Sequence, residues 1–147
     1  MQTQPNTRIT LGDTAADRAV QAALAESRAR NTPVTVVVVD ESGVLKQAIR
    51  MDGAPLVSIR TATDKAYAAA AIGMPTDDFY SAISSDPAAV ASFATREGLA
   101  LIAGGIPIIV GDAVAGAVGV AGAMTGAEDR SIAESAALAG AGTDTSS

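Results

Sequence analysis

The sequence contains no cysteine, no histidine and no tryptophan. Without cysteine, the chain forms no disulfide and no thiolate metal site, and it has no thiol nucleophile. The lack of histidine excludes zinc sites built on imidazole, Ser-His-Asp triads and a proximal histidine on haem. Any chemistry must therefore use carboxylates, lysine, arginine, hydroxyl groups or the backbone.

Positive charge is scarce, with 10 Lys and Arg residues against 16 Asp and Glu residues and a formal net charge of −6. Nucleic-acid binding needs clustered Lys and Arg, so we expect no nucleic-acid partner. No apolar run approaches the ~20 residues of a membrane helix, so we expect no membrane partner either. Residues 1–8 are polar and lack the basic-then-apolar pattern of a secretion signal. These features predict a cytoplasmic protein.

The length of 147 residues and the hydrophobic content of 48% suit one globular domain. We place this domain at residues 9–141, with flexible ends at residues 1–8 and 142–147. Periodicity and turn residues predict helices over residues 11–29, 55–73, 76–84 and 88–95, with a last helix after a capping box at 125–128. Strands are predicted over residues 34–39, 44–51, 99–103, 106–110 and 114–121. This order predicts an α+β fold in which helices flank a five-stranded antiparallel sheet.

Alanine dominates the apolar residues, with 33 copies against two Phe and two Tyr. Small side chains let helices approach their neighbours closely, but each buries little area, at roughly 25 cal/mol per Å². Contacts between subunits would add buried apolar area to a core made of such small side chains. The composition therefore favours a homo-oligomer.

Lys65 and Arg50 are the cations most suited to a site. Lys65, one of two lysines, borders the apolar stripe of its predicted helix, where it could act as a base, an amine nucleophile or an anion anchor. The alternative is a lysine whose head reaches water or Asp64. Arg50 stands where a strand gives way to a helix and could clamp a carboxylate, or simply pair with Asp52.

Glycines and turn acids offer weaker signals. Gly104 and Gly105 join two predicted strands, where they either allow close approach of a ligand or make a tight turn. Acidic residues near the predicted turns lack the Asp-x-Asp-x-Asp spacing of a calcium loop. We therefore predict no metal site.

Short segments along the whole chain carry a resemblance to a known family. They are Ile9–Leu11, Val39–Gly43, Arg50–Pro55 with Ser58, Lys65-Ala66, Met74–Thr76, Gly104–Ile108, Gly116–Val120 and Glu128-Asp129. In order and spacing they resemble the haem-binding-protein/GlcG-like family, which is related to the C-terminal domain of PduO-type proteins. The likeness spans about residues 9 to 140.

The resemblance implies a profilin-like fold, an oligomeric assembly and a small-molecule ligand, with haem as the candidate cofactor. It also implies a ligand-binding pocket formed by Arg50, Asp52, Ser58, Lys65, Gly104 and Gly105. One departure is Ala121, where the family often carries serine, so a ligand bond to that hydroxyl would be lost.

Three functions stay open, and the sequence does not decide whether the protein is an enzyme. The first is binding or degradation of haem or another tetrapyrrole, with iron held by Tyr67, Tyr80, a methionine, Lys65, a threonine or water. The second is an enzyme for a small organic acid or carbonyl compound, with Lys65 as catalytic acid/base and Arg50 as carboxylate anchor. The third is a non-catalytic oligomeric sensor subunit. The first two place the heads of Arg50 and Lys65 in one aliphatic-walled hollow.

Overall fold

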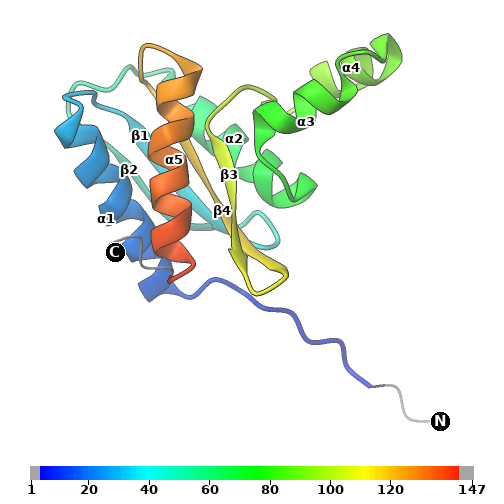
Figure 1. Cartoon of the computed structure of the whole chain (residues 1–147), viewed down its shortest axis with the longest axis horizontal. Helices are drawn as coiled ribbons and strands as arrows, with labels where there is room; N and C mark the ends of the chain where they lie inside the picture. Colours follow the sequence, from blue (N-terminus) through cyan, green and yellow to red (C-terminus); the bar gives the residue numbers. More distant parts are fainter. Residues whose placement is uncertain (1–3, 143–147) are drawn as a thin grey trace.

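The computed structural model describes residues 4–142, so parts of both predicted flexible ends, residues 1–3 and 143–147, lie outside the described residues. Its elements in chain order are α1 (Asp13–Ala29), β1 (Thr35–Asp40), β2 (Leu45–Arg50), α2 (Ser58–Ile72), α3 (Thr76–Ile83), α4 (Pro87–Ala94), β3 (Gly105–Val110), β4 (Ala113–Ala121) and α5 (Gly126–Gly140). Helices α1 and α5 lie side by side on one face of the sheet, and α2 covers the other face (Figure 1). The predicted α+β class with flanking helices is confirmed.

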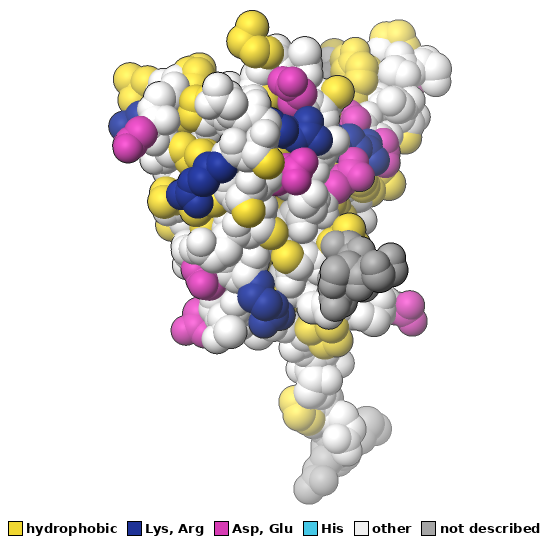
Figure 2. Space-filling model, turned by 60° about the vertical axis from the view of Figure 1, so that its left-hand side comes forward, with side chains coloured by type: hydrophobic (Ala, Val, Ile, Leu, Met, Phe, Trp, Pro, Cys, Tyr) yellow, Lys and Arg dark blue, Asp and Glu magenta, His cyan; other side chains and the backbone are white. Residues whose placement is uncertain are grey.

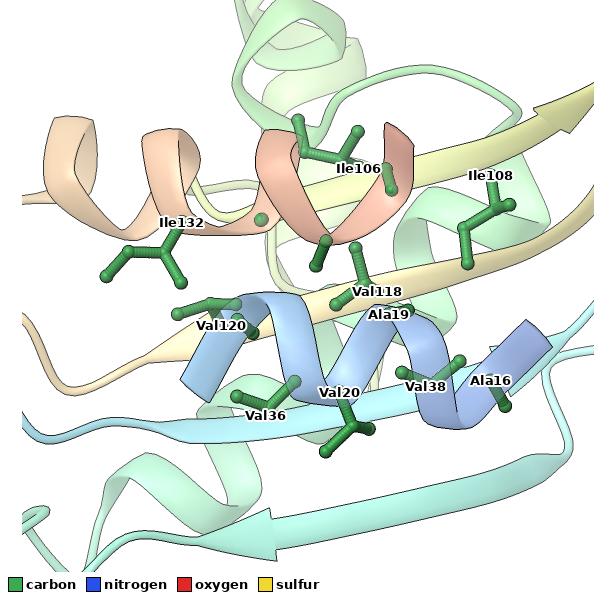
Figure 3. Close-up of a cluster of buried hydrophobic side chains, with 14 of the residues drawn as sticks. Ala16, Ala19, Val20, Val36, Val38, Ile106, Ile108, Val118, Val120 and Ile132 are labelled. Carbon is green, nitrogen blue, oxygen red and sulfur yellow. The ribbon is translucent and has the colours of Figure 1, made fainter. Parts of the chain in front are cut away.

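All strand pairs in the sheet are antiparallel, in the order β2-β1-β4-β3. Strand β1 is central and buried on both faces, which explains its unbroken run of β-branched residues. Val36 and Val38 point into the cluster beneath α1 and α5 (Figure 3), whereas Val37 and Val39 pack against α2. The period of two along one strand thus divides the core into two layers.

Helix α2 lies unusually close to the sheet because the strands beneath it carry glycine. A Cβ atom at Gly119 would collide with the carbonyl oxygen of Ala62, and one at Gly105 would collide with the carbonyl oxygen of Lys65. The side of α2 that faces the sheet is a stripe of fully buried alanines, including Ala62 and Ala66. Small residues on both surfaces therefore bring the helix backbone almost into contact with the strands.

The prediction of five strands is wrong, because the sheet has four and residues 99–103 form none of them. Polar groups of this segment bond to helices instead: the Ala100 N–H donates to the Asp64 carbonyl, and the Thr76 hydroxyl donates to the Ile102 carbonyl. Ala103 and Gly104 form a turn that leads into β3, and the close packing of Gly104 and Gly105 involves Lys65 and Thr76. The tight turn expected at these glycines is therefore present, but it does not join two strands, because residues 99–103 form none.

Helices α3 and α4 form an arm that projects from the body (Figure 1). None of the residues of α4 is buried, and Phe79 of α3 meets Phe93 of α4 edge to face with ring centroids 5.1 Å apart. Asp86 caps α4 by accepting from the N–H groups of Ala88 and Ala89. The aromatic pair thus joins the two helices of the arm, and α3 is held to the body by the hydrogen bonds of Thr76 and by the ion pairs of Asp77 and Asp78 with Arg130 of α5.

Acidic and basic side chains lie interspersed on the face shown in Figure 2. Arg130, for example, pairs with Asp77, Asp78 and Glu134. Within residues 4–142, no helix has both the length and the apolar character needed to cross a membrane.

Candidate functional site

Lys65 is an interior residue whose ammonium group is bound by other parts of the fold. Its side chain is 2% exposed, and Nζ donates to the Val120 carbonyl and to Oδ2 of Asp129, both at 2.9 Å. The other oxygen of Asp129 accepts from the Ala123 N–H at 3.0 Å. Burial raises the pKa of Asp129, and the bond from Lys65 opposes this rise. The ion pair thereby joins α2, β4 and α5.

Arg50 and Asp52, in contrast, are exposed where β2 ends. The Arg50 guanidinium donates to the Ala54 carbonyl at 3.3 Å. Together with Arg28 from α1, the two residues line a hollow of about 270 Å³. The structure therefore does not bring the heads of Arg50 and Lys65 together, because one lies at the surface and the other in the interior.

The remaining predicted site residues are buried in contacts between elements. The hydroxyl groups of Ser58 and Thr35 lie 2.7 Å apart between α2 and β1. A Cβ atom at Gly104 would lie 2.8 Å from Nζ of Lys65, and the Gly105 N–H donates to the Thr76 hydroxyl at 3.1 Å. In this structure, α2 and the side chains of Lys65 and Thr76 pack closely against the two glycines, in the space where a ligand was expected.

A hollow of about 590 Å³ lies between α2 and the edge of the sheet. It exists because α2 packs mainly on β4, β1 and β3 and leaves the edge strand β2 uncovered. Strands β1 and β2 and helix α2 provide its apolar walls. The apolar residues are Val37 and Val39 from β1, Leu45 and Ala48 from β2, and Ile59 and Tyr67 from α2. We call this space the β2–α2 cleft.

Tyr67 occupies a central position beside this cleft. It is 44% exposed, and a Cβ atom at Gly43 would come within 2.7 Å of its ring, so the β1–β2 turn packs directly on the tyrosine. On its other side, Tyr67 lines a second hollow of about 400 Å³ together with Phe79 and Phe93. Three of the four Phe and Tyr residues thus line one hollow. Because aromatic residues are so few in this sequence, each of them could have been examined as a candidate site residue.

Charged residues stand at the rim of the β2–α2 cleft. Arg60 donates from Nε to Asp64 at 3.3 Å and from Nη2 to Glu97 at 3.5 Å. The side chains of Arg60 and Glu97 are 67% and 92% exposed, so their contact is open to solvent. Sequence reasoning missed this pair because 37 residues separate its members.

The residues around the cleft fit a planar, apolar, iron-containing ligand such as haem. The phenol oxygen of Tyr67 is a donor that haem iron accepts in proteins without a proximal histidine. Apolar walls of this extent are typical of ligand sites, whose volumes are about 300–1,000 Å³. Among residues 4–142, no group of three or more carboxylates is arranged to hold a free metal ion.

Comparison with known proteins identifies the family of the chain and agrees with its fold. Residues 11–138 match the model of a protein family described as "Haem degrading protein HbpS-like". The chain belongs to this family. The matched range includes the whole β2–α2 cleft and both residues of the buried ion pair.

Solved structures of other proteins are similar along nearly the whole chain. ORFY of Klebsiella pneumoniae superposes with a TM-score of 0.88 at 25% identity, covering 98% of this chain and 99% of that one. A double mutant of HbpS from Streptomyces reticuli gives a TM-score of 0.79 at 30% identity, with 92% and 89% covered. A structure titled as the PduOC:haem complex gives 0.81 at 23% identity, with 89% and 95% covered, and shares the fold.

Proposed function

We propose that this protein binds haem or a closely related planar tetrapyrrole in the β2–α2 cleft. The observation that carries the proposal is a cleft of about 590 Å³ that combines apolar walls with the phenol of Tyr67. A flat hydrophobic ligand gains free energy by removing such walls from water, and the phenol of Tyr67 is an oxygen ligand of the kind that haem iron accepts. The family description and the haem complex of the similar PduOC structure support the same ligand.

Each part of the cleft has a separate role in this proposal. Tyr67 would hold ferric iron, while Val37, Leu45 and Ile59, which line the cleft, would contact the apolar faces of the ligand. Arg60 stands at the rim, where it pairs with a carboxylate of the ligand. Haem, when bound, supplies an iron centre capable of redox chemistry.

A titration of the purified protein with haemin tests the proposal. We expect a saturable shift of the Soret band at micromolar protein, and loss of the spectroscopic signature of tyrosine ligation in Tyr67→Phe. The matched control is Tyr80→Phe, because Tyr80 is the other tyrosine, is similarly exposed at 47% and lies outside the cleft. Absence of saturable binding to the unaltered protein contradicts haem binding, and identical spectra for both variants contradict ligation by Tyr67.

A second candidate function is binding of a small carboxylate in the hollow between α1 and the end of β2. Arg28, Arg50 and Asp52 line that hollow, and two guanidinium groups beside one carboxylate leave a net positive charge. A hydroxycarboxylate suits this set, because its carboxylate meets arginine and its hydroxyl donates to Asp52.

Chemical-shift changes on titration with lactate test this second function, with propionate as the ligand that lacks the hydroxyl. We expect tighter binding of lactate and loss of binding in Arg50→Gln. Arg30→Gln is the control, because Arg30 pairs with Glu26 instead of lining the hollow. Equal binding of lactate and propionate would contradict the role of Asp52. Lys65 has no part in this function, since its ammonium is bound to Asp129 in the interior.

A further inference from the structure

The rim of the β2–α2 cleft carries more negative than positive charge. Arg60 is the only Lys or Arg among the residues that line the cleft, and Asp64 and Glu97 both line it too. One guanidinium therefore faces two carboxylates, which leaves this rim with a net charge of −1. This net negative charge repels an acidic ligand. Arg60 nevertheless provides the guanidinium group that such a ligand needs as its partner.

The two carboxylates hold Arg60 in different ways. Asp64 lies one turn further along α2, at the i,i+4 spacing that suits a pair within a helix, and its side chain is 22% exposed. Glu97 comes from the chain that follows α4, is 92% exposed, and reaches Arg60 at the rim of the cleft. An exposed pair of this kind is weak, so Glu97 can leave Arg60 without disturbing the fold.

We infer that Glu97 occupies, on Arg60, the place of a ligand carboxylate, and so determines the affinity of the cleft for acidic ligands. This inference rests on the proposed function, because haem carries two propionate groups that require a cation at the rim. When the ligand enters, its carboxylate takes the guanidinium N–H groups that Glu97 occupied, and Glu97 moves into solvent. In the absence of a ligand, the Glu97–Arg60 pair joins α2 to the segment after α4 at the rim of the cleft.

Competition for Arg60 has a specific consequence for ligand choice. Removing the negative charge of Glu97 strengthens binding of a dicarboxylated porphyrin, because Nη2 of Arg60 loses its competing carboxylate and the rim becomes neutral, while Asp64 still pairs with Nε. The same change has little effect on a porphyrin whose carboxylates are esterified, because such a ligand does not compete for the guanidinium. Glu97 is therefore a specificity-determining residue, although it is neither the proposed iron ligand nor one of the apolar residues of the cleft walls.

The test measures dissociation constants for haemin and for haemin dimethyl ester with the full-length protein and its variants. In Glu97→Gln we expect binding of haemin to tighten about two- to fivefold, which corresponds to one exposed ion pair, and binding of the ester to stay unchanged. Glu134→Gln is the matched control, because Glu134 pairs with Arg130 at the surface outside the cleft. A double-mutant cycle with Arg60→Gln separates two effects of Glu97, namely competition with the ligand carboxylate for Arg60 and electrostatic repulsion of that carboxylate.

The outcomes distinguish this inference from the proposed function. If Glu97→Gln tightens haemin binding only when Arg60 is present, the inference is supported. If the gain is equal in the Arg60→Gln background, Glu97 acts by general charge repulsion and the inference is overturned. If the gain is equal for the ester, Glu97 acts independently of the ligand carboxylates, which also overturns the inference. Unchanged haemin affinity in Glu97→Gln also overturns it, while leaving haem binding intact. Failure of haemin to bind the unaltered protein and every variant overturns the proposed function, and the inference with it.

Discussion

Replacement of Lys65 by methionine tests whether this lysine holds the fold together. Methionine keeps the length and apolar character of the side chain but removes the ammonium group that binds Val120 and Asp129. Asp129 then remains 6% exposed with only the Ala123 N–H as its partner. Removal of one member of a buried ion pair typically costs about 3–5 kcal/mol of unfolding free energy.

The size of this loss follows from the proton that Asp129 must take up. In the variant, the pKa of folded Asp129 rises further above its ordinary value of 3.8, because burial is no longer opposed by Lys65. Keeping the acid protonated in the folded state at about pH 7 costs at most ~4.4 kcal/mol, at ~1.36 kcal/mol for each unit above 3.8. This agrees with the cost of breaking a buried pair.

The pH dependence has a definite sign. A folded pKa above the unfolded one means that the folded state binds more protons between the two values, so stability is present at low pH and falls as pH rises. The loss of unfolding free energy in Lys65→Met should therefore shrink by about 1.4 kcal/mol for each unit of falling pH between the pKa of folded Asp129 in the variant and its lower pKa in the unaltered protein. The double variant Lys65→Met/Asp129→Asn should lose this dependence.

Urea denaturation followed by circular dichroism between about pH 8 and about pH 5 measures these free energies by linear extrapolation. The control is Lys46→Met, which alters the other lysine at an exposed position of β2 and should change stability by less than about 0.5 kcal/mol. A loss below about 1 kcal/mol at neutral pH, or a loss independent of pH, would refute the structural role of the Lys65–Asp129 pair.

Three further predictions concern the fold and the assembly. Gly119→Ala should lower the free energy of unfolding by about 3 kcal/mol, measured by thermal or urea denaturation, because the added Cβ atom would collide with the backbone of α2. Gly12→Ala should change it little, because a Cβ atom there has open space. Asp86→Ala should cost about 1 kcal/mol as the cap of α4 is lost, and amide exchange should show the loss in α4 alone, since that helix buries no residue. Size-exclusion chromatography with light scattering should give a mass above that of one chain; a clean 14.5 kDa monomer would contradict the homo-oligomer.

The sequence by itself determined the elements whose signals are local. The β-branched run before Asp40 predicted a buried strand, and the structure shows β1 covered on both faces. Gly73 ends α2 in the left-handed conformation with φ of 83°, and the Thr125 hydroxyl accepts from the Glu128 N–H as the capping box required. Periods, caps and turns depend on neighbours in the chain, so the sequence is sufficient to locate them.

The tertiary structure alone decided which side chains meet and what each one does. Lys65 and Asp129 are 64 residues apart, so no local pattern shows that the lysine is bound in the interior rather than free in a pocket. Gly43 and Tyr67 meet only because α2 crosses the sheet beside the β1–β2 turn, and the cleft forms only because α2 leaves β2 uncovered. Residues 99–103 have an apolar pattern suited to a strand, yet their partners lie on helices. A local pattern records what a segment can form, whereas its partners depend on how the faces of the whole chain pack together.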